Sequence, residues 1–180
     1  SRIAGQSPIT ALAVEGARLR ELNTVPSGGI GPTIGVVDRS GRNLLTTHYS
    51  SNSIVCFRLH RDGSVGERSA YLGKPFAPPA SIPAEPAPAG AMRNDAPGRK
   101  VSADEVAAGR TKPHAIVLSR SERYAVAAEI DSNRCVVLRF DARRGTLEQH
   151  SEAPAPADAG PRHLMFGRDG RFLYTSDEAN

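Results

Sequence analysis

The sequence predicts an all-β fold of the β-propeller type, and three observations support this prediction. First, one pattern occurs three times without gaps: a proline, an apolar run, a polar turn containing arginine, and a second apolar run. Pro32, Pro113 and Pro161 open the three copies. Second, the last two copies are about 48 residues apart, which is close to the length of one propeller blade. Third, short apolar runs alternate with turn-forming residues along most of the chain, which is typical of antiparallel strands.

The composition is that of a globular protein, with 39% hydrophobic and 23% charged residues. The net charge of +4 comes from arginines that are scattered along the chain rather than gathered in one basic block. We therefore expect no nucleic-acid partner. No apolar run is long enough to span a bilayer, and no secretory signal pattern is present. We therefore expect no membrane partner either.

Two cysteines, Cys56 and Cys135, lie in apolar, strand-like runs. Buried free thiols are a simpler interpretation than a disulfide or a metal-binding pair. Free thiols agree with a reducing compartment, so we expect a cytoplasmic location. The sequence contains no zinc-binding, phosphate-loop or serine-nucleophile motif. We therefore expect no metal site and no cofactor.

Residues 1–30 are interpreted as the end of one blade. Strands are expected at Ile9–Val14 and Leu19–Val25, with a turn at Glu15-Gly16 between them. These would be the third and fourth strands of that blade. Residues 31–72 are then expected to form a complete blade. Its four strands are expected at Thr33–Val37, Asn43–His48, Ser53–Leu59 and Val65–Leu72.

Residues 73–111 interrupt the repeat and separate its first two copies by about 81 residues. Half of the chain's 14 prolines fall in this segment. Because proline cannot donate a hydrogen bond to a strand ladder, we expect an irregular Pro/Ala-rich insertion loop. The spacing of Ser102 and Glu105 is that of a capping box and predicts one short helix through Ala108.

Residues 112–159 are expected to form the next blade, and residues 160–180 the start of another. The expected strands of the complete blade are His114–Leu118, Tyr124–Glu129, Arg134–Phe140 and Thr146–Ser151. Ala153-Pro154-Ala155-Pro156 is expected to be a stiff connector after the last of them. The strands therefore amount to about three four-stranded blades.

The polar residues that differ between the repeat copies gather at one predicted edge. In an antiparallel blade, the start of the first strand and the end of the second strand lie at the same edge, and the first strand lines the propeller axis. Equivalent first-strand starts carry Thr33, His114 and Arg162. His163 should point away from Arg162, because side chains alternate along a strand. When the repeat copies are aligned, each set of equivalent positions forms a column. At the second-strand ends, the first column holds His48, Glu129 and Asp177, and the second holds Tyr49, Ile130 and Glu178.

Three of these residues form the predicted catalytic group, namely His114, Arg162 and Glu178. An arginine fork can bind a carboxylate or phosphate, and a histidine can exchange a proton near neutral pH. A carboxylate can orient the histidine or share in the proton transfer, so either His114 or Glu178 could be the base. The candidate substrate-binding residues are His48, Glu129, His163 and Asp177. A solvated strand end is the simpler interpretation of each residue in this second set.

Several motifs resemble the lactonase family of seven-bladed propellers. This family includes the propeller-type 6-phosphogluconolactonases of bacteria and the fungal carboxy-cis,cis-muconate lactonising enzyme. The motifs are Asp38-Arg39-Ser40-Gly41-Arg42, Tyr49-Ser50-Ser51-Asn52-Ser53-Ile54-Val55, Pro113-His114, Gly160-Pro161-Arg162-His163-Leu164 and Asp169-Gly170-Arg171-Phe172-Leu173-Tyr174. The resemblance implies that His114, Arg162 and Glu178 stand at the family's functional positions. The family's usual Asn-Glu pair is here Asp177-Glu178.

The resemblance implies a lactonase-like hydrolase that acts on a small anionic sugar lactone such as 6-phosphogluconolactone. One alternative is a carboxymuconate-type lactonising cycloisomerase, in which the same groups would move a proton without net hydrolysis. Another alternative is a non-catalytic propeller that serves as a binding platform, or an inactive fragment. A blade stack that is open at both ends exposes strand edges and apolar faces. We therefore expect the chain to self-associate or to require its remaining blades.

Overall fold

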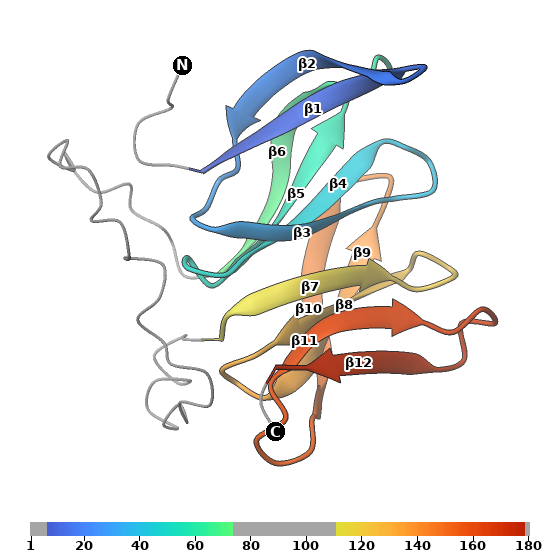
Figure 1. Ribbon diagram of the computed structural model, residues 1–180. Helices are drawn as coiled ribbons and strands as arrows, with labels where there is room; N and C mark the ends of the chain where they lie inside the picture. Colours follow the sequence, from blue (N-terminus) through green and yellow to red (C-terminus); the bar gives the residue numbers. More distant parts are fainter. Residues whose placement is uncertain (1–6, 74–110, 179–180) are drawn as a thin grey trace, which may run out of the picture.

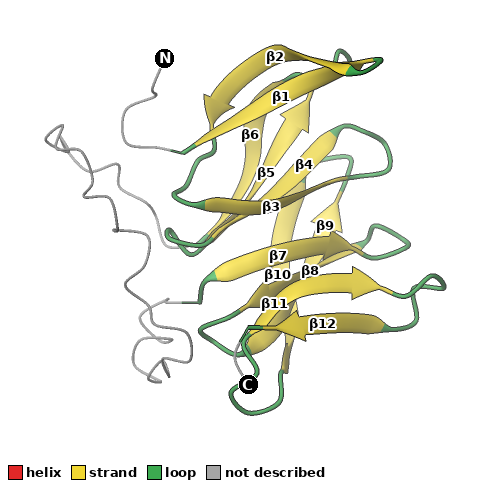
Figure 2. Ribbon diagram, viewed as in Figure 1, coloured by secondary structure: helices red, strands yellow, loops and turns green. Residues whose placement is uncertain are grey.

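The structure is a computed structural model that describes residues 7–73 and 111–178. Most of the expected insertion loop, including the helix expected at 102–108, lies outside the described residues. The described chain forms strands and turns without a helix (Figure 2). Accordingly, none of its segments is a helix long and apolar enough to cross a membrane. The all-β prediction is confirmed.

Twelve strands run through the described residues (Figure 1). They are β1 (Pro8–Glu15), β2 (Arg18–Pro26), β3 (Pro32–Val37), β4 (Asn43–His48), β5 (Ser53–Leu59), β6 (Val65–Leu72), β7 (Pro113–Leu118), β8 (Tyr124–Glu129), β9 (Arg134–Asp141), β10 (Thr146–Pro154), β11 (Pro161–Phe166) and β12 (Leu173–Asp177). All neighbouring strands pair antiparallel, in two four-stranded sheets (β3-β4-β5-β6 and β7-β8-β9-β10) and two hairpins (β1-β2 and β11-β12). These are the four-stranded blades that the repeat predicts.

Turn chemistry explains why the first two strands of each copy meet. The turn between β3 and β4 is built around Asp38, which is 2% exposed. Its carboxylate accepts hydrogen bonds from the Ser40 hydroxyl (2.6 Å) and from the main-chain amides of Arg42 (2.9 Å) and Asn43 (2.8 Å). In each copy of the repeat, the turn between the first two strands also contains one residue with a positive φ, in the left-handed region. These residues are Gly41 (φ 68°), Glu122 (φ 55°) and Gly170 (φ 72°).

Observed strand ends differ from the predicted ends by no more than a few residues, and one expectation was wrong. Ala153 and Pro154 are not part of a connector, because they continue β10 and pair with Cys135 and Arg134 of β9. A register shift between Gln149 and Ser151 precedes this extension. A proline is tolerated there because β10 is an edge strand, whose outer side needs no ladder donor.

The first strands of successive blades, β3, β7 and β11, lie side by side (Figure 1). The main core fills the space between the two complete sheets. It joins Leu45, Ile54 and Cys56 of one sheet to residues such as Ile116 and Leu138 of the other. Burial of apolar side chains between the sheets is therefore what fixes one blade against the next. The expectation of buried free thiols at both cysteines is also confirmed.

The outer faces of the two hairpins carry exposed apolar side chains. On β1-β2, Leu12, Val14 and Leu19 are 48%, 75% and 66% exposed, and on β11-β12, Met165 and Tyr174 are 68% and 59% exposed. Exposed apolar patches of this kind mark surfaces that another structure covers.

Candidate active site

Strand register brings the predicted site residues to one end of the blades. The three repeat prolines pair with the three residues of the first predicted column, in the pairs Pro32–His48, Pro113–Glu129 and Pro161–Asp177. First-strand starts and second-strand ends therefore share an edge, as expected. In Figure 1 the starts of β3, β7 and β11 all lie at the left. We call this end of the molecule the strand-start edge.

His114 stands at the strand-start edge, and the preceding blade fixes its main chain. The Thr33 hydroxyl lies 2.7 Å from the His114 carbonyl oxygen, and the Thr47 hydroxyl lies 3.0 Å from the same atom. The two hydroxyls also lie 2.8 Å from each other. Because β3 and β4 supply these threonines, the start of β7 is held directly to its neighbour.

Two rings lie edge-on to the His114 imidazole. The ring centroid of Tyr49, just after β4, is 6.2 Å away, and that of His163 on β11 is 5.2 Å away, each at an interplanar angle of 86°. Edge-to-face packing of this kind is a favourable arrangement for aromatic rings. Three consecutive blades therefore contribute to the surroundings of one imidazole.

The surroundings of His114 hold its imidazole in the neutral form. Burial, with the positive charges of Arg162 and His163 as further causes, lowers its pKa from 6.5 to about 4, while a backbone group of Arg162 acts in the opposite direction. The Nδ1 atom is buried and has no hydrogen-bond partner. A neutral imidazole can accept a proton at physiological pH.

Arg162 and Glu178 form an ion pair beside His114. Arg162 Nε lies 2.9 Å from Glu178 Oε2, although its N–H bond is not aligned with that oxygen. Both side chains are substantially exposed, at 42% and 37%. The main-chain amide of Glu178 donates to the Gly160 carbonyl (2.9 Å), which holds the two segments together. Through these contacts the structure places the three predicted catalytic residues in one neighbourhood.

His163 lies closer to His114 than side-chain alternation suggests. A register shift between Pro161 and His163 in the β11–β12 pairing breaks the regular alternation at this point. As a result, His163 packs on His114 while Arg162, its neighbour, also acts on that imidazole. Both neighbours therefore act on the same imidazole, which the expectation of opposite side-chain directions did not anticipate.

The other candidate substrate-binding residues have hydrogen bonds or electrostatic surroundings of their own. His48 is fully buried, with both ring nitrogens lacking a hydrogen bond, and burial lowers its pKa despite opposing backbone groups of Ser53 and Ser27. Glu129 is 7% exposed and accepts hydrogen bonds from Arg134 Nε (2.8 Å) and the Ser132 hydroxyl (2.7 Å).

Asp177 is exposed at the end of β12, and its charge contributes to raising the pKa of the buried Cys135 thiol, after burial itself. The Asp177 carboxylate therefore interacts electrostatically with Cys135 on β9. A role in substrate binding for His48, Glu129 and Asp177 stays a prediction.

No metal centre accompanies this arrangement in the described part of the chain, which holds no group of three or more His, Cys, Asp or Glu side chains suited to a metal ion. The strand-start edge presents a neutral imidazole, a guanidinium and a carboxylate.

Comparison with known proteins agrees with the repeat and the sheet order. Residues 2–180 match the family described as "Lactonase, 7-bladed beta-propeller". The chain belongs to this lactonase family. No curated protein sequence matches it.

Solved structures share the fold of this lactonase-family chain. A proposed 6-phosphogluconolactonase from Bacteroides uniformis is 23% identical, with a TM-score of 0.72, over 97% of this chain and 44% of its own. The periplasmic gluconolactonase of Pseudomonas aeruginosa is 21% identical, with a TM-score of 0.69, over 94% of this chain and 42% of its own. A proposed 6-phosphogluconolactonase from Bacteroides fragilis is 20% identical, with a TM-score of 0.67, over 95% and 44%. The chain thus spans less than half the length of these proteins.

Two residues near the candidate site were not predicted from the sequence as part of it. Tyr49 was predicted to lie at the end of the second strand but was given no role, and Lys112 opens the predicted 112–159 blade but was not assigned to the site. The ammonium of Lys112 lies 4.7 Å from the centre of the Tyr49 ring. An aromatic residue next to a second-strand end was the available signal for Tyr49. Nothing in the sequence alone marks Lys112, which simply precedes the repeat proline.

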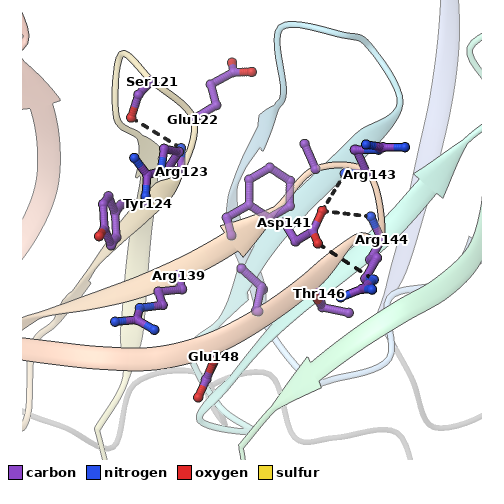
Figure 3. Close-up of a pocket in the computed structure, with 13 residues that line it drawn as sticks. Ser121, Glu122, Arg123, Tyr124, Arg139, Asp141, Arg143, Arg144, Thr146 and Glu148 are labelled. Atoms are coloured by element: carbon purple, nitrogen blue, oxygen red, sulfur yellow. Dashed lines mark hydrogen bonds and ion pairs between the residues drawn. The ribbon is translucent and has the colours of Figure 1, made fainter.

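A separate pocket of about 850 Å³ lies at the opposite end of the β7–β10 sheet, around the β7–β8 and β9–β10 turns (Figure 3). Its lining includes Arg123, Arg139, Arg143 and Arg144. It also includes Asp141, which accepts hydrogen bonds from the main-chain amides of Arg143 (2.9 Å) and Arg144 (3.1 Å). None of the residues around His114 lines this pocket, so we place the candidate active site of the lactonase-family chain at the strand-start edge.

Proposed function

We propose that the strand-start edge hydrolyses the ring ester of a small anionic sugar lactone such as 6-phosphogluconolactone. The observation that supports this most is the convergence of His114 with the Arg162–Glu178 ion pair, drawn from two consecutive blades. A general base next to a cationic anion-binding group is what the hydrolysis of an anionic ester requires.

In the proposed reaction, neutral His114 takes a proton from a water molecule while the water oxygen bonds to the lactone carbonyl carbon. Collapse of the resulting tetrahedral intermediate breaks the bond between the carbonyl carbon and the ring oxygen. The proton held by His114 then passes to that oxygen, so lactone and water give one hydroxy acid. We assign the base to His114 rather than Glu178, because Glu178 is already paired with Arg162.

Arg162 has the role of binding the anionic group of the substrate. The Glu178 carboxylate pairs with the Nε side of the Arg162 guanidinium, and the Nη groups of a guanidinium supply a bidentate fork for phosphate or carboxylate. Glu178 would then orient that fork. This division explains why a carboxylate stands next to the group that is proposed to bind an anion.

The test is hydrolysis of 6-phosphogluconolactone by the purified chain and by two site variants. We expect His114→Gln to lower kcat/KM by about 100-fold or more, because positioned general bases contribute that much. We expect Arg162→Gln to raise KM by about 10-fold or more for the phosphorylated lactone and much less for uncharged gluconolactone, since charge-assisted contacts to the phosphate are lost. His150→Gln is the matched control, because His150 is exposed on β10 and lies outside the site.

Two outcomes of these assays would favour a different function. Turnover of a carboxymuconolactone without net hydrolysis would favour the cycloisomerase. A folded chain that turns over neither lactone would favour a binding platform or a fragment that is inactive without further blades. If the His114→Gln variant hydrolysed the lactone at the wild-type rate, His114 would not be the base.

A further inference from the structure

We propose that Tyr49, held by the buried Lys112–Asp131 ion pair, is a positioning residue that fixes the imidazole of His114. The effect on hydrolysis rests on the proposed function, whereas the effect on the imidazole itself does not.

The ion pair is buried where the chain enters the β7–β10 sheet. Lys112 Nζ lies 3.4 Å from Asp131 Oδ2, and the two side chains are 8% and 7% exposed. Main-chain hydrogen bonds fix the same region, because the amide of Ile130 donates to the Lys112 carbonyl (3.2 Å) and that of Asp131 donates to the Thr111 carbonyl (3.2 Å). A buried charge pair is strongly destabilising to break, so it holds its surroundings in one arrangement.

Lys112 adopts a backbone conformation that its sequence context disfavours. Its φ is 49°, although it is not glycine and it precedes Pro113, and a residue before proline favours extended geometry. Such strain persists only where the surrounding structure enforces it, and it is commonly found at functional sites. Here the side-chain carbonyl of Asn52 accepts the amides of Thr111 (3.1 Å) and Lys112 (2.9 Å).

The enforced position puts the ammonium of Lys112 against Tyr49 of the preceding blade. The ammonium lies 4.7 Å from the ring centroid, which is within cation–π range. The amide of Tyr49 donates to the Gly31 carbonyl (2.8 Å), so both the main chain and the ring of Tyr49 are fixed. The ring in turn presents itself edge-on to His114. One blade therefore supplies the ammonium and the imidazole, and its neighbour supplies the ring between them.

Both neighbouring blades contribute residues to the surroundings of His114. His163 and Arg162 come from the next blade, with Glu178 paired to Arg162, while Tyr49 comes from the preceding blade with Lys112 behind it. Tyr49 is the uncharged member of this set that contacts the ring. The contribution of Tyr49 is to hold the orientation of the His114 imidazole. It also keeps water away from the side of the imidazole that faces Tyr49, and so helps to keep the imidazole buried.

The experiment follows the histidine Hε1 resonances by NMR during a pH titration. The chain has 5 histidines, and the His114 signal is assigned as the one absent from His114→Gln. The variants are Tyr49→Leu, which removes the ring, and Lys112→Met/Asp131→Asn, which removes both buried charges together. Tyr49→Phe keeps the ring and is the matched control, and the His150 signal is the internal reference.

In Tyr49→Leu and in the double variant, we expect the His114 midpoint to rise by about one pH unit toward its usual value. We expect kcat/KM for the lactone to fall about 10-fold with little change in KM, because a misplaced base loses rate rather than binding. Tyr49→Phe should stay within about 2-fold of wild type and keep the wild-type midpoint.

An unmoved His114 midpoint in folded Tyr49→Leu would overturn the positioning role, even where the wild-type chain hydrolyses lactones. A moved midpoint in a chain without lactonase activity would support the positioning role and refute the proposed function. Tyr49 is only half-buried, so Tyr49→Leu provides a decisive variant if the double variant does not fold.

Discussion

The proposed role of His114 as a base predicts a specific dependence of activity on pH. Only the neutral imidazole can take a proton from water, and its pKa in the folded chain is lowered to about 4 by burial, by Arg162 and by His163. The value of kcat/KM should therefore be constant at neutral pH and should fall as the pH drops through about 4. A histidine with an ordinary pKa would lose activity near pH 6.5 instead.

The size of the difference is easy to measure. At pH 5, a group with a pKa near 4 is about 90% neutral, whereas a group with a pKa near 6.5 is only about 3% neutral. The two cases therefore predict activities at this pH that differ by about 30-fold. Removing the cation in Arg162→Gln should move the midpoint upward, because the charge of Arg162 is one cause of the lowered pKa.

The assay measures initial rates of lactone hydrolysis at substrate concentrations well below KM, at constant ionic strength, with the spontaneous rate subtracted. A phosphate group has its own second pKa near 6, so the midpoint is measured with both 6-phosphogluconolactone and uncharged gluconolactone. Agreement between the two substrates assigns the midpoint to the free protein. A wild-type midpoint near pH 6.5 would refute the description of His114, and an unmoved midpoint in Arg162→Gln would refute the role of its charge.

Three further predictions concern stability and assembly. Asp38→Ala should lower the free energy of unfolding in urea by about 3 kcal/mol, because it leaves several turn donors unpaired, whereas Asp62→Ala in an exposed turn should have a much smaller effect; equal effects of the two substitutions would contradict the structural role of Asp38. Gly29→Ala should cost about 1–3 kcal/mol through overpacking, since its Cβ would lie 2.6 Å from the Ser51 hydroxyl and 2.7 Å from the His48 ring; an unchanged melting temperature would contradict this. Light scattering should give a mass above the 19.1 kDa of one chain, because both outer hairpins expose apolar faces; an active, well-folded monomer would show that no partner is needed.

Much of the fold could be predicted because it depends on local patterns. Turn residues such as the Asp38 and Gly41 pair fix where strands stop, and the repeat transfers each boundary from one blade to the next. The strand-start edge could be predicted for the same reason, since antiparallel pairing alone places His48 opposite Pro32. Only where a local rule was overridden did the expectation fail, as at Pro154, which an edge strand tolerates.

Contacts within the candidate site could be predicted only in part. Comparison of equivalent positions in the repeat copies predicted His114 and Arg162 as site residues. It could not show that Glu129 forms an ion pair with Arg134, five residues further along the chain. It could not show that a register shift turns His163 toward His114. These outcomes depend on distances between side chains that a repeat pattern does not contain.

The sequence alone determined the strand order, the blade repeat and the end of the blades at which chemically active residues gather. These properties follow from side-chain alternation and turn chemistry, which act over a few residues. The tertiary structure alone decided which side chains meet and which protonation state they hold. The rings of Tyr49 and His163, from neighbouring blades, pack on the His114 imidazole, and desolvation acts through space rather than along the chain.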